Sequence, residues 1–434
     1  MMPWPVSSLA TLALCASITG CKRAPEGAPF RAISPNAFAD GAKPTFVVGT
    51  LGDDQVDARI RGQAELVRQL FFPAAPLLDD AAVKLDALPP QLIVYGGANV
   101  NSLTAALAPG LPFELSADHL RIGSLDLTGD AWQLITVVPE RTGEHAHPEL
   151  LFYGGTGRVG GVAEINAVGS GNESILVADA FGPYVVGRWV ANDDGSVRPV
   201  LDHPAPRIKW REVAGTLAIH RFPADLGAGP HEAELIQAAE RGLATTVAAL
   251  GLTAPTPIAI YTYPDVRSKQ ALTGKAGDGH AAIAARALHI VGRPDPAAIE
   301  HLVAHEATHV LAYDAIGAPG SPLFGEGVAV WVAGQYGGGT LDEWRAHLPP
   351  KLPTVADLIG PAFRKLPERE AYPLAGIFVS VAVERVGRDP FFAHLYGATA
   401  ATWADACKRA GTSAADLEAA FKAKLAQPPP PPNR

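Results

Sequence analysis

Apolar positions are spaced differently in the two halves of the chain, and the change falls near residue 208. Before that point, short apolar runs alternate with polar segments, which is typical of buried strands in an α/β sheet. The runs that predict strands are residues 46–48, 91–95, 134–138, 150–153 and 175–178. Residues 58–72 and 101–107 have the helical spacing expected between such strands. The pattern therefore predicts an accessory α/β domain over residues 44–208.

A proline-rich break at residues 202–206 precedes the second pattern, in which apolar positions mostly follow the helical repeat. Short strands are expected at residues 216–220, 257–263, 279–284 and 287–291. Helices are expected at residues 230–250, 297–315, 341–347, 355–359, 373–386, 400–410 and 417–425. The three glycines at 337–339 are expected to form a mobile loop. We therefore predict an α+β, mostly helical domain over residues 209–427 and a proline-rich tail over 428–434.

The composition is that of a globular protein with a large core. The chain has 434 residues, of which 48% are hydrophobic and 18% are charged, and this length allows two or three domains. The formal net charge is −9 and the isoelectric point is near 5.8, which argues against nucleic acid as a partner.

Residues 1–20 contain no charged side chain and have an apolar centre, which predicts a secretory signal peptide. Residues 18–21 (Ile-Thr-Gly-Cys) resemble a bacterial lipobox, and this resemblance implies cleavage before Cys21 and a lipid on that cysteine. Because Lys22 follows, the resemblance also implies that the lipid anchors the protein in the outer membrane, on the periplasmic side of the cell envelope. Residues 21–43 would then be a flexible tether between the membrane and the first domain. An ordinary secretory peptide with an incidental Cys21 remains the alternative.

Two histidines stand one turn apart in the helix expected at residues 297–315, for which Asp295 is the expected N-cap. His305 and His309 leave the same face of a helix, so both imidazoles can hold one metal ion. Glu306 is offset to the side of this pair, where its carboxylate can reach a water on the metal without being a ligand. This is the H-E-x-x-H arrangement of zinc hydrolases.

A catalytic zinc ion needs a third protein ligand, and Glu326 follows His309 by 17 positions (326 − 309 = 17). Glu326 lies in the otherwise apolar run 323–331, where a buried carboxylate is costly unless it is paired or bound to a metal. If this second helix packs against the first, Glu326 completes a site of two histidines and one glutamate. A chance H-E-x-x-H with histidines that only fill a core is the alternative, and the placement of Glu326 counts against it.

The pattern H-E-x-x-H followed by E-G-x-A at residues 326–329 resembles the gluzincins, and specifically the peptidase-MA-like family. Downstream, residues 371–379 and 383–387 resemble the tyrosine-led helix of that family. The resemblance covers roughly residues 210–425. It implies a zincin-like, thermolysin-like catalytic domain that binds Zn2+ and hydrolyses peptide bonds.

The resemblance also implies a role for each residue of the motif. The zinc ligands would be His305, His309 and Glu326. Glu306 would be the general base for a zinc-activated water. Tyr372 would stabilise the oxyanion, and a simple packing role for this tyrosine is an equal alternative. A peptide or protein substrate would lie along the edge strand at residues 281–284.

Two other functions are compatible with the same motif. One is a catalytically inactive, zincin-like lipoprotein of the cell envelope that binds or interacts with a partner. The other is a hydrolase that uses the same zinc chemistry on a non-peptide amide. Zinc analysis and a Glu306→Gln variant separate these functions from a peptidase.

Residues 155–160 spell G-x-G-x-x-G after an expected strand, and Asp179 follows Gly155 by 24 positions (179 − 155 = 24). This nearly matches the dinucleotide-binding fingerprint. Because glycines interrupt the helix that the fingerprint requires, we predict a glycine-rich turn and no bound nucleotide. His145 and His147 are expected to be surface histidines in a nearby polar loop.

Overall fold

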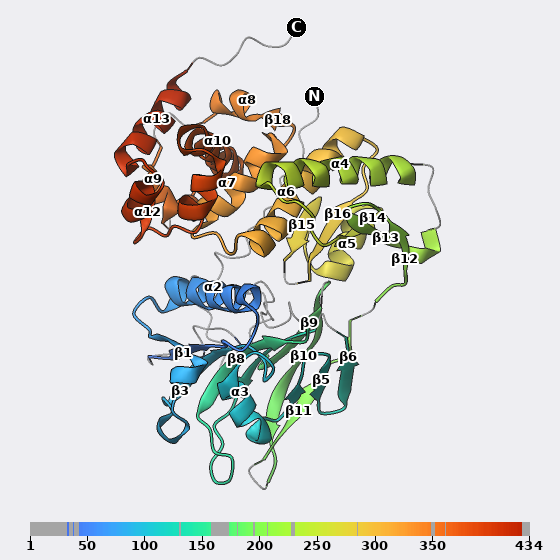
Figure 1. The fold of residues 1–434 in the computed structure, drawn as a ribbon. Helices are drawn as coiled ribbons and strands as arrows, with labels where there is room; N and C mark the ends of the chain where they lie inside the picture. Colours follow the sequence, from blue (N-terminus) through green and yellow to red (C-terminus); the bar gives the residue numbers. More distant parts are fainter. Residues whose placement is uncertain are drawn as a thin grey trace, which may run out of the picture. The chain divides into compact units, whose positions relative to one another are not determined.

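The computed structural model divides the chain into two compact units (Figure 1). Unit 1 comprises the described residues up to Ile208 together with Pro264–Asp278. Unit 2 comprises Lys209–Tyr263 together with the described residues from Gly279 onward. Unit 1 is rich in β-sheet and unit 2 is largely helical.

The structure describes most of both units. The described residues are Ile33, Phe38, 43–129, 132–157, 173–179, 181–193, 196–205, 207–226, 231–283, 285–348, 352–360 and 362–427. The expected signal peptide, Cys21 and the proline-rich tail lie outside them. Within the described ranges, no helix is both long enough and apolar enough to cross a lipid bilayer.

An eight-stranded sheet with strand order β11-β10-β9-β7-β8-β3-β1-β2 forms the centre of unit 1. Its strands are β1 (Thr45–Val48), β2 (Leu77–Asp79), β3 (Gln91–Tyr95), β7 (Gln133–Val138), β8 (Glu149–Gly155), β9 (Ile175–Asp179), β10 (Gly182–Ala191) and β11 (Val197–Leu201). The four strands from β8 to β2 are mutually parallel, and the remaining neighbours are antiparallel. A second, three-stranded sheet contains β4 (Glu114–Leu115), β5 (His119–Ile122) and β6 (Leu125–Thr128).

The central strands of this large sheet are buried on both faces, which explains their continuous apolar runs. Successive residues of a strand point to opposite faces, so Phe46 and Val48 join one core cluster while Val47 joins another. Helix α2 (Asp54–Phe71) contributes to the first cluster, and helix α3 (Ser102–Leu107) contributes to the second. The strands predicted from these runs are confirmed.

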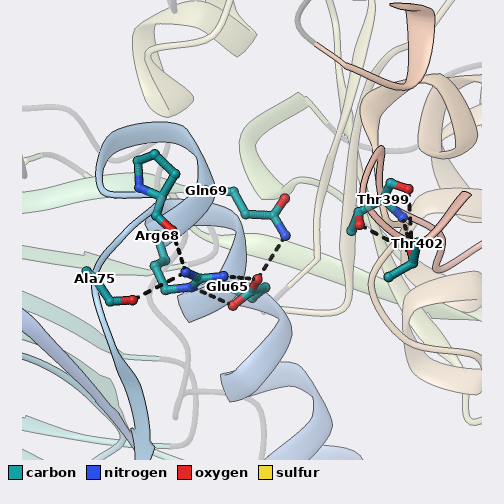
Figure 2. A network of polar contacts seen from close by, with 7 residues as sticks. Glu65, Arg68, Gln69, Ala75, Thr399 and Thr402 are labelled. Atoms are coloured by element: carbon teal, nitrogen blue, oxygen red, sulfur yellow. Dashed lines mark hydrogen bonds and ion pairs between the residues drawn. The ribbon is translucent and has the colours of Figure 1, made fainter. Parts of the chain in front are cut away.

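A polar network around Arg68 fixes the C-terminal end of α2 (Figure 2). The Arg68 guanidinium donates to the Glu65 carboxylate at 2.8 and 2.6 Å, and to the carbonyl oxygens of Pro73 at 2.8 Å and Ala75 at 3.3 Å. The Gln69 amide donates to Glu65 at 2.9 Å. By satisfying carbonyl oxygens beyond the helix end, Arg68 holds the turn that leads from α2 into β2.

Unit 2 is built on a five-stranded sheet with strand order β12-β13-β14-β16-β15. Its strands are β12 (Trp210–Ala214), β13 (Ala218–Pro223), β14 (Ile258–Tyr263), β15 (Gly279–Ala282) and β16 (Ala287–Val291). β13, β14 and β16 are parallel, whereas β15 runs antiparallel to β16 and forms one edge of the described sheet. Helices α4 (Glu232–Leu250) and α6 (Pro296–Ala315) share a core cluster with inward-facing residues of β14 and β16.

Helix α6 packs against α7 (Pro322–Ala333), and α7 packs against α10 (Glu368–Val386) (Figure 1). Glycine at position 327, directly after Glu326, allows α7 and α10 to approach closely. A Cβ at Gly327 would lie only 2.8 Å from the carbonyl oxygen of Ala375. The small residue therefore sets how deeply the helix that carries Glu326 sits among its neighbours.

Further elements belong to the rest of unit 2. They include β17 (Gln335–Tyr336), β18 (Gly339–Thr340), α8 (Leu341–Arg345), α9 (Val355–Ile359), α11 (Arg388–Pro390), α12 (Trp403–Arg409) and α13 (Ala414–Ala426). One further helix, α5 (Val266–Thr273), lies in the segment grouped with unit 1.

One expectation about unit 2 is wrong in its start, and another is refined. The helix predicted to start at Pro373 begins at Glu368, so the proline lies inside it. Pro373 removes one helix hydrogen bond, and the acidic first turn favours the helix start through the helix dipole. In the loop expected at residues 337–339, residues 337 and 338 form the turn of a short hairpin, in which Gln335 pairs with Thr340 and Tyr336 pairs with Gly339.

Candidate metal centre

Helix α6 brings together the two histidines of the H-E-x-x-H motif. The Nε2 atoms of His305 and His309 are 3.4 Å apart. The two rings meet edge to face, with centroids 5.0 Å apart and an interplanar angle of 79°. Two nitrogen donors on one helical face therefore converge on a common point.

Helix α7 supplies a third donor to the same point. Glu326 Oε2 lies 3.6 Å from the Nε2 atoms of both His305 and His309. Among the described residues, these three form the one group of at least three His, Cys, Asp or Glu side chains that is compact enough to hold a metal ion. The three side chains are 16%, 18% and 24% exposed, so the group is partly open to solvent.

The separations among the three donor atoms fit a tetrahedral zinc ion. With ligand distances of about 2.0–2.2 Å, two ligands of a tetrahedral zinc ion lie about 3.3–3.6 Å apart. The observed separations of 3.4, 3.6 and 3.6 Å fall in this range. Two imidazoles and a carboxylate are also a donor set that zinc accepts, and they leave a fourth position for another ligand.

Burial and charge act in opposite directions on these donors. Burial alone would raise the pKa of the Glu326 carboxyl, but the charges and hydrogen bonds of His309 and His305 outweigh it and hold that pKa well below its usual range. Burial would lower the pKa of His309, and the Glu326 carboxylate more than offsets this effect and raises it. Glu326 is therefore an ionised carboxylate that is paired with the two histidines.

Glu306 lies on the same helix and outside the three-donor group. Its side chain is buried, at 9% exposure, and its carboxylate lies against the edge strand β15. A Cβ on Gly279 would be 3.0 Å from Glu306 Oε1 and 2.7 Å from Leu302 Cδ1. Glycine at position 279 therefore leaves the space that the Glu306 carboxylate occupies.

Tyr372 lies beside the histidine pair, in the second turn of α10. Its ring stacks on the His305 ring, with centroids 6.3 Å apart and an interplanar angle of 15°. Burial raises the pKa of the Tyr372 phenol far above its usual range, and the negative charges of Glu326 and Glu368 and a hydrogen bond with Glu326 raise it further. The phenol therefore keeps its proton and can act as a hydrogen-bond donor.

Two more side chains next to Tyr372 were not predicted from the sequence. The Tyr336 ring meets the Tyr372 ring edge to face at 5.4 Å, and the Tyr336 hydroxyl donates to Glu368 Oε1 at 2.9 Å. Glu368 precedes Tyr372 by one helical turn, and this spacing is the signal that was visible in the sequence. Tyr336 had no such signal, because it comes from the separate hairpin β17–β18.

A third histidine of α6 lies outside the three-donor group and contacts α7. His301 lies one turn before His305, and its Nδ1 donates to the carbonyl oxygen of Ala333 at 2.8 Å. Ala333 is the last residue of α7. His301 therefore ties α6 to the end of the helix that carries Glu326, and it positions the third donor.

The glycine-rich pattern at residues 155–160 is arranged differently from a dinucleotide site. Strand β7 lies between β8 and β9, so the two strands of the pattern are not neighbours in the sheet. The Asp179 carboxylate pairs with both Arg207 Nε and Nη2 at 2.9 Å. Residues 158–160 lie outside the described ranges. The fingerprint requires adjacent strands and an acid that is available to a ribose, and neither is present.

The two histidines of the nearby loop differ from each other. His145 is exposed, as expected. His147 is buried, and its Nδ1 donates to the carbonyl oxygen of Pro148 at 2.9 Å. The prediction of a surface histidine is therefore wrong for His147, because its backbone pairs with Arg141 and draws this end of the loop against unit 1.

Comparisons with known proteins give a likeness in structure without a match in sequence. No protein-family model matches the chain, and no curated protein matches it. Similar solved structures include an M1 zinc metallopeptidase from Deinococcus radiodurans, at 14% identity and a TM-score of 0.33, with 57% of this chain and 63% of that chain covered. A mutant two-domain M1 zinc metallopeptidase bound to L-arginine is similar at 14% identity and a TM-score of 0.30, with coverage of 57% and 61%. The chain thus spans less than two thirds of the length of these structures.

Proposed function

We propose that the chain is a zinc metallopeptidase of the gluzincin type. The observation that carries this proposal is the convergence of His305, His309 and Glu326, with donor separations of 3.4 to 3.6 Å. These residues would hold Zn2+. When bound there, the ion would supply an activated water and polarise the carbonyl group of the substrate.

Glu306 would act as the general base. Its carboxylate lies beside the donor group on the same helix and is confined by the backbone at Gly279. It would accept a proton from the attacking water and deliver that proton to the leaving amine. Confinement favours this role, since a general base must stay within hydrogen-bond reach of the proton that it takes.

Tyr372 would stabilise the oxyanion that develops on the substrate carbonyl. The stack of the Tyr372 ring on the His305 ring supports this role. The raised pKa of the phenol keeps its proton in place at neutral pH. A preorganised donor in a partly buried site stabilises a developing negative charge more than the same donor does in water.

The edge strand β15 would bind the substrate backbone. It pairs with β16 on one side and ends the described sheet on the other. The His280 ring stacks on the His289 ring at 4.7 Å, which supports the strand from the face opposite Gly279. An extended peptide would add to this edge by backbone hydrogen bonds. The strand ends at Ala282, and Ala284 lies outside the described residues.

The test uses soluble protein that lacks residues 1–21. We expect one zinc ion per chain by metal analysis, and zinc-dependent cleavage of a mixed peptide library. Glu306→Gln should retain zinc and lose turnover, because it keeps the three donors and removes the base. A Glu306→Gln variant as active as the parent would refute the mechanism. A protein that holds zinc and cleaves nothing would instead favour the envelope interaction protein.

Export and membrane anchoring belong to the same proposal and have a separate test. The lipobox-like residues 18–21 support a lipid on Cys21 and a location in the bacterial cell envelope. Cys21→Ser should release the full-length protein from the membrane fraction. Unchanged retention of the variant in that fraction would exclude lipidation as the anchor.

A further inference from the structure

The turn between β15 and β16 contains an arginine with an unusual backbone conformation. Arg286 has a φ angle of 49°, in the left-handed region that residues other than glycine seldom adopt. Its N–H donates to the carbonyl oxygen of Ile283 at 3.0 Å, which closes the turn. Glycine would adopt this conformation without strain, so the contacts of the arginine side chain have to offset its cost.

Those contacts tie the turn to two other elements of unit 2. The Arg286 guanidinium donates to the carbonyl oxygen of Thr256 at 2.8 Å, in the segment before β14, and forms an ion pair with Asp314. The paired side chains are 22% and 12% exposed, so solvent screens this pair only in part. Asp314 is the last residue but one of α6, where the helix dipole disfavours a carboxylate. Each partner is unfavourable on its own, and the ion pair compensates for both.

Asp314 belongs to the helix that carries the two candidate histidine donors. It follows His309 by five positions (314 − 309 = 5), which is about 7.5 Å along the axis of α6. Near the start of β15, Gly279 lies against Leu302 and Glu306 of the same helix. The edge strand is therefore fixed to α6 at both of its ends, and His309 lies between the two points of contact.

The spacing of the two contacts on α6 matches the length of the strand. From Glu306 to Asp314 a helix rises about 12 Å, and from Gly279 to Ile283 an extended chain advances about 13 Å. β15 therefore runs beside α6 over the stretch that contains His309 (Figure 1). A shift of either end of the strand would change the position of its edge relative to the metal donors.

We propose that Arg286 and Asp314 are positioning residues, which align a peptide bound along β15 with the metal centre. This inference rests on the proposed peptidase function. Because the ion pair holds the far end of the strand, it affects the subsites near Ala282 more than those beside Glu306. A peptide that pairs with the whole strand therefore depends on the ion pair, and a peptide that occupies only the subsites next to the metal does not.

The experiment measures peptide binding to zinc-loaded Glu306→Gln protein, in which cleavage is blocked. The probes are a hexapeptide and a tripeptide that share the residues around the expected scissile bond. Asp314→Asn keeps the size of the side chain and removes its charge. We expect it to weaken hexapeptide binding about tenfold and to change tripeptide binding by less than about twofold. Arg286→Met should give the same loss, and the double variant no further loss, because both changes remove one interaction.

Rescue and control variants separate positioning from general stability. Arg286→Lys keeps a positive charge within reach of Asp314 and should recover most of the hexapeptide affinity. Glu300→Gln removes an ion pair from the same helix, in which Glu300 contacts Arg241 of α4 at 2.7 Å. This control should leave the affinities of both peptides unchanged, and metal analysis should find zinc in every variant.

Two results would overturn the inference. One is an unchanged hexapeptide affinity in Asp314→Asn. The other is an equal loss for the hexapeptide and the tripeptide, because it would indicate a general loss of structure. Cleavage of no peptide by zinc-loaded protein with Glu306 intact would overturn the peptidase function instead, since the binding comparison needs no turnover.

Discussion

A single methyl group at position 279 tests the geometry proposed for the general base. A Cβ on Gly279 would lie 2.7 Å from Leu302 Cδ1 and 3.0 Å from Glu306 Oε1. Ordinary contacts between such atoms begin at about 3.5 Å. The substitution Gly279→Ala therefore requires Leu302 or the Glu306 carboxylate to move by about 0.5–0.8 Å.

The expected consequence of Gly279→Ala is a loss of kcat without a loss of metal. A displacement of roughly 1 Å in a reacting group costs about 100-fold in rate. The zinc content should stay unchanged, because the three atoms nearest to the new Cβ belong to Leu302 and Glu306 and not to the three donors. Overpacking should lower the free energy of unfolding by about 1–3 kcal/mol, which leaves the domain folded.

The assay compares kcat, zinc content and thermal unfolding of Gly279→Ala with those of the parent. Gly292→Ala is the matched control, because its new Cβ would meet Thr262 of β14 at 3.2 Å and Leu235 of α4 at 3.4 Å. This control should keep the kcat of the parent. If Gly279→Ala is folded, zinc-loaded and as fast as the control, Glu306 does not need the space that the structure leaves for it, and the reasoning fails.

Three further predictions concern other parts of the molecule. Tyr372→Phe should lower kcat about 100-fold with little change in zinc content, measured by steady-state kinetics and metal analysis; an unchanged kcat would leave the ring with a packing role only. Gly327→Ala should destabilise unit 2 by about 1–3 kcal/mol in chemical denaturation and weaken zinc binding, because its Cβ would meet the Ala375 carbonyl oxygen at 2.8 Å; wild-type values for both would contradict the close helix contact. The hydrogen bond from Arg68 lowers the pKa of Glu65 in the folded protein. The ionised Glu65 therefore stabilises the fold above the unfolded pKa of about 4.3, and this stabilisation is lost as the pH falls through the lower pKa of the folded state. Thermal unfolding from pH 7 to pH 3 should therefore show a smaller acid loss for Glu65→Gln than for the parent, and identical losses would exclude this pair as a contributor.

The sequence by itself determined the features that depend on neighbours within one or two turns of the chain. The pairing of His305 with His309 follows from the helical repeat, and the helix start follows from the Asp295 side chain, which accepts the backbone N–H of Ala297 at 3.0 Å. The buried strands of unit 1 could be predicted for the same reason. In a run such as 91–95 nearly every residue is apolar and buried, so adjacent positions in the sequence indicate that both faces of the strand are covered. These features are local, so they do not require knowledge of what packs against them.

Only the tertiary structure decided which distant side chains meet. The apolar run around Glu326 predicted a helix, and the packing of α7 between α6 and α10 brings its carboxylate within 3.6 Å of both imidazoles. Two further contacts, of Gly279 with Glu306 and of Tyr336 with Glu368, join elements that are separate in the chain. No regular spacing in the sequence relates these positions. The direction of such side chains depends on how closely helices approach, and that distance is set by residues such as Gly327 on several elements at once.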